Sequence, residues 1–235
     1  MTAPARVTVE NTAVRRVAVG AGLGLIGGLI ALAAPALLAN ELLNAAGPIG
    51  ARSITTDGSL VAIGAVALVG SFFFYGRGFA AWQDVDRSFR AATVLVAVGS
   101  LGALVLVVAA VVVVSSPSAI AACLAGDLTR ALPCVYGASP LGRATTIAIF
   151  AGEMVGAAGL VLGLLRAARH LRSPWMAAGG VTYGAVLGTL LYLLVPGGTP
   201  FGPVPVSAGG TLAGLAVLAP IFVWAGDRRY RRVRR

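Results

Sequence analysis

One uninterrupted apolar stretch restricts this chain more than any other feature. From Ala91 to Val114 the sequence reads AATVLVAVGSLGALVLVVAAVVVV and holds no charged residue. A helix of this length crosses the roughly 30 Å hydrocarbon core of a bilayer. Only 11% of all residues are charged, against about 25% in a typical soluble domain, so the chain lacks the side chains that a water-facing surface needs. The sequence therefore predicts an integral membrane protein.

Further segments of the chain have the same apolar character. Together with the first they occupy approximately Val17–Ala39, Ser59–Tyr75, Ala91–Val114, Ala144–Leu165, Trp175–Val195 and Gly209–Ala225. The period-two alternation of a β-barrel is absent, and a helix satisfies its own backbone polar groups within lipid. We predict an all-α, polytopic bundle of about six transmembrane helices, which forms a single membrane domain over residues 1–235.

Arginine is distributed unevenly among the predicted connections. The N-terminal tail, the second and fourth connections and the C-terminal tail are rich in Arg, whereas the connections between them are poor in it. Basic connections lie on the cytoplasmic side, so this alternation predicts six crossings with both termini in the cytoplasm. The bias toward Ala, Gly, Val and Arg, with no Lys, is typical of a prokaryote, whose plasma membrane is the expected location.

The first apolar segment has a second interpretation, as a cleaved secretory signal. Arg15 and Arg16 precede it, and Ala34-Pro35-Ala36 resembles a cleavage site. The apolar run continues to about Ala39, which is longer than the usual apolar region of a signal and favours a retained helix.

The net charge of +10 raises the question of nucleic-acid binding. The Arg residues stand beside apolar segments, so a membrane surface explains them better, and we expect no nucleic-acid partner. The C-terminal cluster predicts an anchor to anionic lipid head groups, formed by Arg228, Arg229, Arg231, Arg232, Arg234 and Arg235.

Both cysteines of the chain fall in the third connection, Ser115–Arg143, which is predicted to be external. Cys123 and Cys134 would then meet an oxidising compartment, which predicts a structural disulfide. The spacing differs from the C-x-x-C of a redox pair, and two cysteines without a nearby His cannot complete a metal site.

Glycines recur at intervals of four in several apolar segments. Such spacing places small residues on one helix face, where two backbones can approach closely. It predicts packing within the bundle, with a homo-oligomeric seam as the alternative. The glycines concerned are Gly20, Gly24, Gly28, Gly152, Gly156, Gly159, Gly163, Gly180, Gly184, Gly188, Gly210 and Gly214.

Two connections have a particular composition. In the second, Phe79, Trp82, Val85 and Phe89 have helical spacing, which predicts a short helix on the cytoplasmic leaflet or a loop with aromatic anchors. The fifth, PGGTPFGPVPVSAGG, is rich in Gly and Pro and predicts an external turn or a short re-entrant segment.

Glu153 is the residue most indicative of function, because it is an acid inside an apolar segment. An ionised acid at the bilayer centre costs about 2.5 to 3.5 kcal/mol, so we expect Glu153 to be neutral or to contact water. Register predicts that Ser100 and Tyr183 lie at a similar depth as hydrogen-bond partners. Glu153 then either carries a proton or binds a substrate, or it joins neighbouring helices.

The sequence gives no constellation for catalysis. The one histidine, His170, lies in a basic connection and is expected to be solvated, and no zinc-protease, nucleotide or dinucleotide motif is present. We therefore expect no enzyme, no cofactor and no metal. Two functions remain: a small transporter with a site around Glu153, or a non-enzymatic subunit or scaffold that packs against partner proteins or lipids.

Overall fold

The computed structural model describes residues 3–44, 51–124, 140–194 and 206–233, and these residues form α-helices joined by short turns. No β-strand occurs in this part of the chain, in agreement with the all-α prediction. The helices are α1 (Ala3–Asn44), α2 (Ala51–Gln83), α3 (Phe89–Ser115), α4 (Pro117–Leu124), α6 (Pro140–Leu171), α7 (Pro174–Leu194) and α8 (Val206–Val233).

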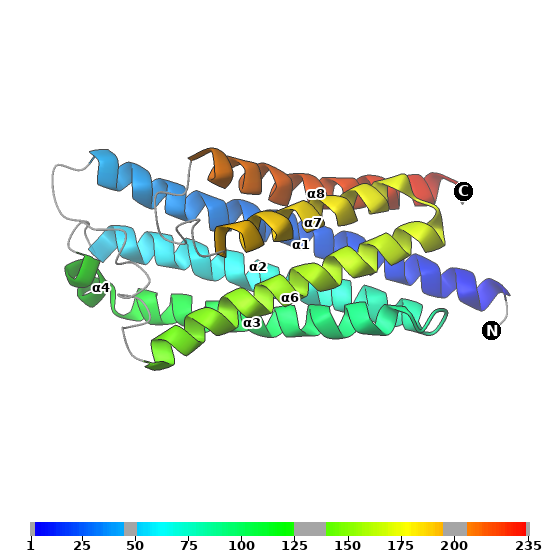
Figure 1. Cartoon of the computed structure of the whole chain (residues 1–235), viewed down its shortest axis with the longest axis horizontal. Helices are drawn as coiled ribbons and strands as arrows, with labels where there is room; N and C mark the ends of the chain where they lie inside the picture. Colours follow the sequence, from blue (N-terminus) through cyan, green and yellow to red (C-terminus); the bar gives the residue numbers. More distant parts are fainter. Residues whose placement is uncertain (1–2, 45–50, 125–139, 195–205, 234–235) are drawn as a thin grey trace.

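The long helices form a closed ring. Each packs against the next in the chain, in the order α1, α2, α3, α6, α7 and α8, and α8 returns to pack against α1. Successive helices run in opposite directions, so both termini lie at the same end of the bundle (Figure 1). We call this the basic end, because it also holds the Arg-rich turns between α2 and α3 and between α6 and α7. The opposite end, which carries α4, is the far end.

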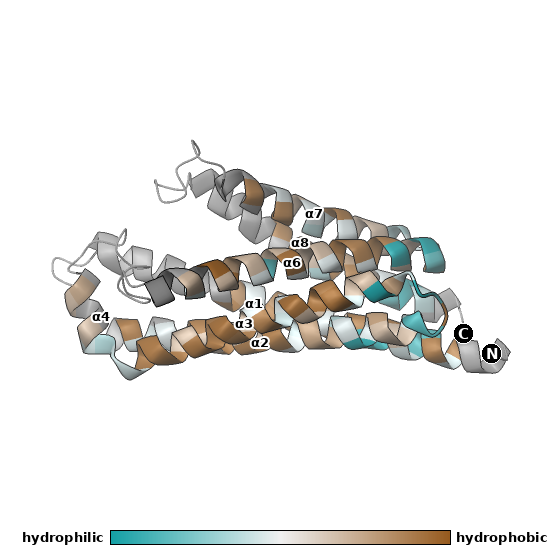
Figure 2. Ribbon diagram, turned by 60° about the horizontal axis from the view of Figure 1, so that its bottom comes forward, coloured by the Kyte–Doolittle hydropathy of each residue, from teal (hydrophilic) through white to brown (hydrophobic). Residues whose placement is uncertain are grey.

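Within the described residues, four helices contain stretches long and apolar enough to cross a membrane: Val7–Ile30, Ile54–Gln83, Phe89–Ser115 and Ile147–Leu171. Figure 2 shows hydrophobic residues along the bundle and hydrophilic ones gathered at the basic end. The membrane class of the fold is thus supported, and the count of about six stays a prediction. The helix boundaries also differ from the predicted ones. The second apolar segment was predicted to end at Tyr75, whereas α2 continues to Gln83.

Large apolar side chains face outward on every long helix, as a lipid-facing surface requires. A soluble protein exposes only small apolar patches, so this many exposed apolar side chains suit contact with lipid rather than with water. Examples, in chain order, are Ile26, Ile63, Phe73, Leu101, Val108, Ile147, Val181 and Ile221.

The second connection was predicted wrongly. Phe79 and Trp82 belong to α2, and together with Phe89 at the start of α3 they are fully buried inside the bundle. The rings of Trp82 and Phe89 lie 5.2 Å apart between centroids. Helical spacing of aromatic residues is the same for a core face and for a membrane-surface face, so the sequence could not separate the two.

The large side chains of the packed core lie in the half of the bundle next to the basic end. Its largest members are Tyr75, Phe79, Trp82 and Phe89, which we call the aromatic cluster, and α6 contributes Leu160 and Leu164. Residue 163 must be glycine here, because a side chain would overlap the Phe79 ring.

The predicted glycine packing is confirmed where α3 crosses α6. A Cβ atom added to Gly102 would lie 2.8 Å from the Cα atom of Gly152, and one added to Gly156 would lie 2.7 Å from the Cα atom of Gly99. These glycines therefore pack within the bundle, as expected for small residues in membrane helices. Gly28 and Gly188 have open space beside them and do not serve this purpose.

Candidate functional site

Glu153 lies on the face of α6 that turns toward the interior of the ring. It is spaced by seven, eleven and fourteen positions from the core residues Leu160, Leu164 and Ala167, and such spacing aligns side chains along one helix face. Its neighbour Gly152 contacts α3. Glu153 thus continues the core-facing stripe of α6 toward the far end.

The large side chains of the core cluster lie between Glu153 and the basic end. Among the described residues, Leu160 is the α6 member of the core cluster nearest the far end, and Glu153 lies about 10 Å beyond it along the axis. The carboxyl is half-buried, and it has no recorded hydrogen bond or ion pair within the described part of the chain. At the level of Glu153 the interior is lined by small residues such as Gly102 and Ala103 of α3, and Ile149, one turn farther along α6, is again buried.

Ser100 lies near the level of Glu153, on α3. A Cβ atom at Gly102 would be 3.1 Å from the backbone nitrogen of Glu153, and Ser100 is only two residues from Gly102. However, Gly99 and Gly102 provide the close contacts with α6, and no hydrogen bond joins Ser100 to Glu153. The structure therefore brings the two residues to a similar depth without pairing them.

Tyr183 lies at a different depth from the one that register predicted. The adjacent Gly184 faces Val161, with 3.9 Å between its ideal Cβ position and the Val161 side chain. Val161 is eight residues from Glu153, or about 12 Å along α6. The ring of Tyr183 packs instead edge-on against Tyr75, with 6.4 Å between centroids.

Tyr75 and Tyr183 form a small polar region inside the ring. The hydroxyl of Tyr75 is buried, and the hydroxyl of Tyr183 is the polar group that interacts with it. Ser71, one turn away on α2, donates to the carbonyl of Gly20 over 2.8 Å, and the Tyr183 hydroxyl lies 3.6 Å from the ideal Cβ position of Gly24.

Sequence reasoning missed a polar contact that joins three helices at the basic end. His170, in the last turn of α6, lies with its Nε2 atom 3.2 Å from a carboxylate oxygen of Glu10 on α1. Tyr230 on α8 donates to the other oxygen over 3.4 Å. Only 17% of the His170 side chain and 8% of the Glu10 side chain are exposed, so the expectation of a solvated histidine is wrong.

The reason for the error is distance along the chain. Glu10 and Tyr230 stand near opposite termini, and nothing local to His170 indicates either of them. Only closure of the ring between α8 and α1 brings them together. An acid in an N-terminal helix and a lone histidine were the only available signals.

The turn between α2 and α3 holds a second carboxylate, that of Asp86. The backbone N–H of Ser88 donates to its Oδ1 atom over 2.8 Å. This bond is the largest cause that lowers the pKa of Asp86 below its usual value, followed by the Ser88 hydroxyl and, more weakly, by His170 and Arg166. Asp86 is therefore ionised at neutral pH and adds negative charge near Arg166.

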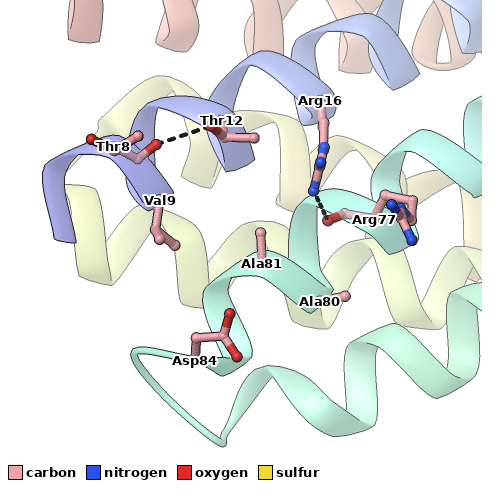
Figure 3. Close-up of a pocket in the computed structure, with 8 residues that line it drawn as sticks. All are labelled: Thr8, Val9, Thr12, Arg16, Arg77, Ala80, Ala81 and Asp84. Atoms are coloured by element: carbon pink, nitrogen blue, oxygen red, sulfur yellow. Dashed lines mark hydrogen bonds between the residues drawn. The ribbon is translucent and has the colours of Figure 1, made fainter. Parts of the chain in front are cut away.

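Two open grooves lie at the basic end. The first, of about 370 Å³, lies between α1 and α2, and Figure 3 shows Arg16 donating to the backbone carbonyl of Arg77 over 3.3 Å, with Asp84 across the groove. The second, of about 410 Å³, lies between α1 and α8 beside Arg15, Trp224 and Arg228. Glu153 lines neither of these grooves.

The remaining predicted residues are only partly described. Cys123 lies near the end of α4, but Cys134 is outside the described residues, so the disulfide stays a prediction. Arg228, Arg229, Arg231 and Arg232 belong to α8, whereas Arg234 and Arg235 fall outside the described residues. No group of three metal-ligating side chains occurs in the described part of the chain.

No family model, no curated protein and no solved structure matches this chain.

Proposed function

We propose that this chain is a small six-helix transporter of the plasma membrane, in which Glu153 carries a proton or binds the cationic part of a solute. The proposal places the basic end in the cytoplasm and assigns no enzymatic reaction to the protein. Its main support is the position of Glu153, on the interior face of α6 and beyond the aromatic cluster. An acid in a membrane helix is functional by default.

The surroundings of Glu153 argue against a purely structural carboxyl. A structural acid joins two helices through hydrogen bonds, and those are worth about 0.6 kcal/mol on average, less than the cost of placing the acid in hydrocarbon. The described structure gives Glu153 no such bond, and Tyr183 is two turns away. Access to water from the far end would remove the cost, and it would make the carboxyl available to a proton or a cation.

The aromatic cluster supplies the other requirement of a transporter, a closed side. The rings of Tyr75, Phe79, Trp82 and Phe89 fill the interior between Glu153 and the basic end. A solute that reached Glu153 from the far end would meet this barrier. Alternating access would require the cluster to rearrange, and the function therefore depends on motion in the basic half.

Carbodiimide labelling tests the proposal. A protonated carboxyl adds to a carbodiimide and rearranges to a stable N-acylurea, which mass spectrometry locates on a peptide. We expect a water-soluble carbodiimide, applied to the far-end side of oriented vesicles, to label Glu153, and labelling to fall as pH rises. Folded protein that stays unlabelled at Glu153 would contradict the proposal and favour the alternative, a packing subunit without a solute pathway.

A flux measurement completes the test. Proteoliposomes under an imposed membrane potential should take up protons, and Glu153→Gln should abolish the uptake because the amide cannot titrate. Asp84→Asn makes the same chemical change at an exposed residue in the α2–α3 turn and serves as the matched control. Uptake that is unchanged in Glu153→Gln would contradict the role assigned to this carboxyl.

A further inference from the structure

The groove between α1 and α8 combines cationic and apolar surfaces in a definite order. On α1, Arg15 is followed one turn later by Val19 and a further turn later by Gly22. On α8, which runs in the opposite direction, Trp224 precedes Arg228 by one turn. The guanidinium groups therefore lie toward the basic end, and the apolar residues lie deeper along both helices.

The aromatic wall of this groove is held in place by two contacts. The indole N–H of Trp224 donates to the backbone carbonyl of Ala18 over 3.1 Å, which ties α8 to α1. The guanidinium carbon of Arg228 lies 5.7 Å from the centre of the Trp224 ring, within the range of a cation–π contact. The absence of a side chain at Gly22 leaves space beside the indole, since a Cβ atom there would lie 3.8 Å from it.

The groove has a net positive charge. Asp227 also lines it, but this carboxylate is 6% exposed and is already engaged within the structure. Arg15 and Arg228 are exposed and stand on different helices. Two guanidinium groups converging from two helices favour a phosphate, with which arginine forms paired hydrogen bonds.

We propose that this groove binds one anionic phospholipid, with its phosphate between Arg15 and Arg228 and an acyl chain along Val19, Gly22 and the Trp224 ring. A lipid fits better than a free phosphate for two reasons. The apolar part of the groove belongs to Val7–Ile30, which is apolar enough to span a membrane, and Val19 and Trp224 are 40% and 44% exposed. Exposed tryptophan and arginine at a helix end are typical of the lipid–water interface.

The position of the lipid has a structural consequence. Helices α1 and α8 are the first and last of the chain, and their contact closes the ring. No connection joins them directly, so a phosphate that bridges Arg15 and Arg228 adds a link at this seam. Anionic lipid therefore stabilises the closed ring, independently of any transport through Glu153.

Thermal unfolding in nanodiscs tests the site. We expect a higher Tm in phosphatidylglycerol than in phosphatidylcholine, and the double variant Arg15→Gln/Arg228→Gln should lose most of this difference. The control variant Arg87→Gln/Arg90→Gln removes the same charge from exposed residues at the same end of the bundle. It should keep the Tm difference between the two lipids. If both double variants lost the Tm difference equally, overall charge would explain the effect and the proposal would be overturned. An unchanged Tm difference in Arg15→Gln/Arg228→Gln would overturn it as well.

Fluorescence quenching provides a second readout that does not depend on stability. Phosphatidylglycerol brominated near the head group should quench the emission more than brominated phosphatidylcholine does, and Trp224→Phe should remove the excess. Inorganic phosphate should not displace the brominated lipid. Displacement by phosphate would indicate a free-anion site instead, and excess quenching that survives in Trp224→Phe would contradict the assigned position.

Discussion

The two halves of the bundle are held together by different means. In the half next to the basic end, aromatic side chains from α2 and α3 fill the interior, and Glu10, His170 and Tyr230 join three helices through one carboxylate. In the far half, helices touch in pairs through glycine: an added Cβ atom at Gly27 would lie 2.9 Å from the carbonyl oxygen of Gly64. Leu68 and Ala103 extend the core cluster toward that half, but the large fully buried rings of the described residues all lie in the basic half.

Under the proposed transporter function, this difference separates stability from function along one axis. A region that binds a solute or a proton must contain space and at least one polar group, whereas a packed aromatic core leaves little space. Packing in membranes depends on van der Waals contact because lipid removes the hydrophobic driving force. The basic half then anchors the fold and leaves the far half, with Glu153, free to hold a site.

The largest expected effect follows from emptying the core of the basic half. Trp82→Ala should reduce the free energy of unfolding by about 3–5 kcal/mol, because it leaves a large cavity among fully buried rings. Denaturant titration in detergent measures the loss. Phe73→Ala removes a comparable ring that is 55% exposed and should have a much smaller effect. Similar losses for both variants would contradict the assignment of the core.

A smaller effect is expected at the glycine crossing of α3 and α6. Gly102→Leu should cost about 1–3 kcal/mol, because its side chain would enter the backbone of Gly152 and force the helices apart. Gly28→Leu is the matched control, since nothing lies within 4 Å of an added Cβ atom there. A tolerated Gly102→Leu in the same denaturant assay would show that the far half relies on other contacts.

The polar contact at the basic end should contribute less still. His170→Ala removes the imidazole of α6 that contacts Glu10 but leaves the hydrogen bond from Tyr230 in place. We therefore expect the free energy of unfolding to fall by about 1 kcal/mol. His170→Gln, which keeps a donor, should recover part of it. Calorimetric Tm values for the three proteins decide the point, and an unchanged Tm in His170→Ala would show that this contact adds nothing to ring closure.

Much of this organisation follows from the sequence. The helical class, the positions of the apolar segments and the packing at Gly152 and Gly156 depend on local composition and spacing, which are visible in one chain. The interior position of Glu153 agrees with its expected cost in lipid. Such features require no knowledge of which helices are neighbours.

The failures have a common physical cause. The pairing of His170 with Glu10 depends on how close α6 comes to α1, and the depth of Tyr183 depends on how α7 is shifted along α6. The aromatic residues of α2 were placed at the membrane surface because spacing reveals a face but not what covers it. Relative helix placement, rather than helix formation, is the information that the sequence lacks.

The smallest expected effect concerns Asp86, and its sign follows from the pKa. Hydrogen bonds from Ser88 lower the folded-state pKa below the usual value of 3.8, so ionised Asp86 stabilises the folded state. This contribution is fully present above the unfolded pKa and is lost as pH falls through the folded pKa. The Tm difference between wild type and Asp86→Asn should therefore be constant near neutral pH and narrow below about pH 3.8. Asp84→Asn, at an exposed residue of the same turn, is the control, and its Tm difference from wild type should not narrow in acid. If it did, general charge repulsion at low pH would explain both variants.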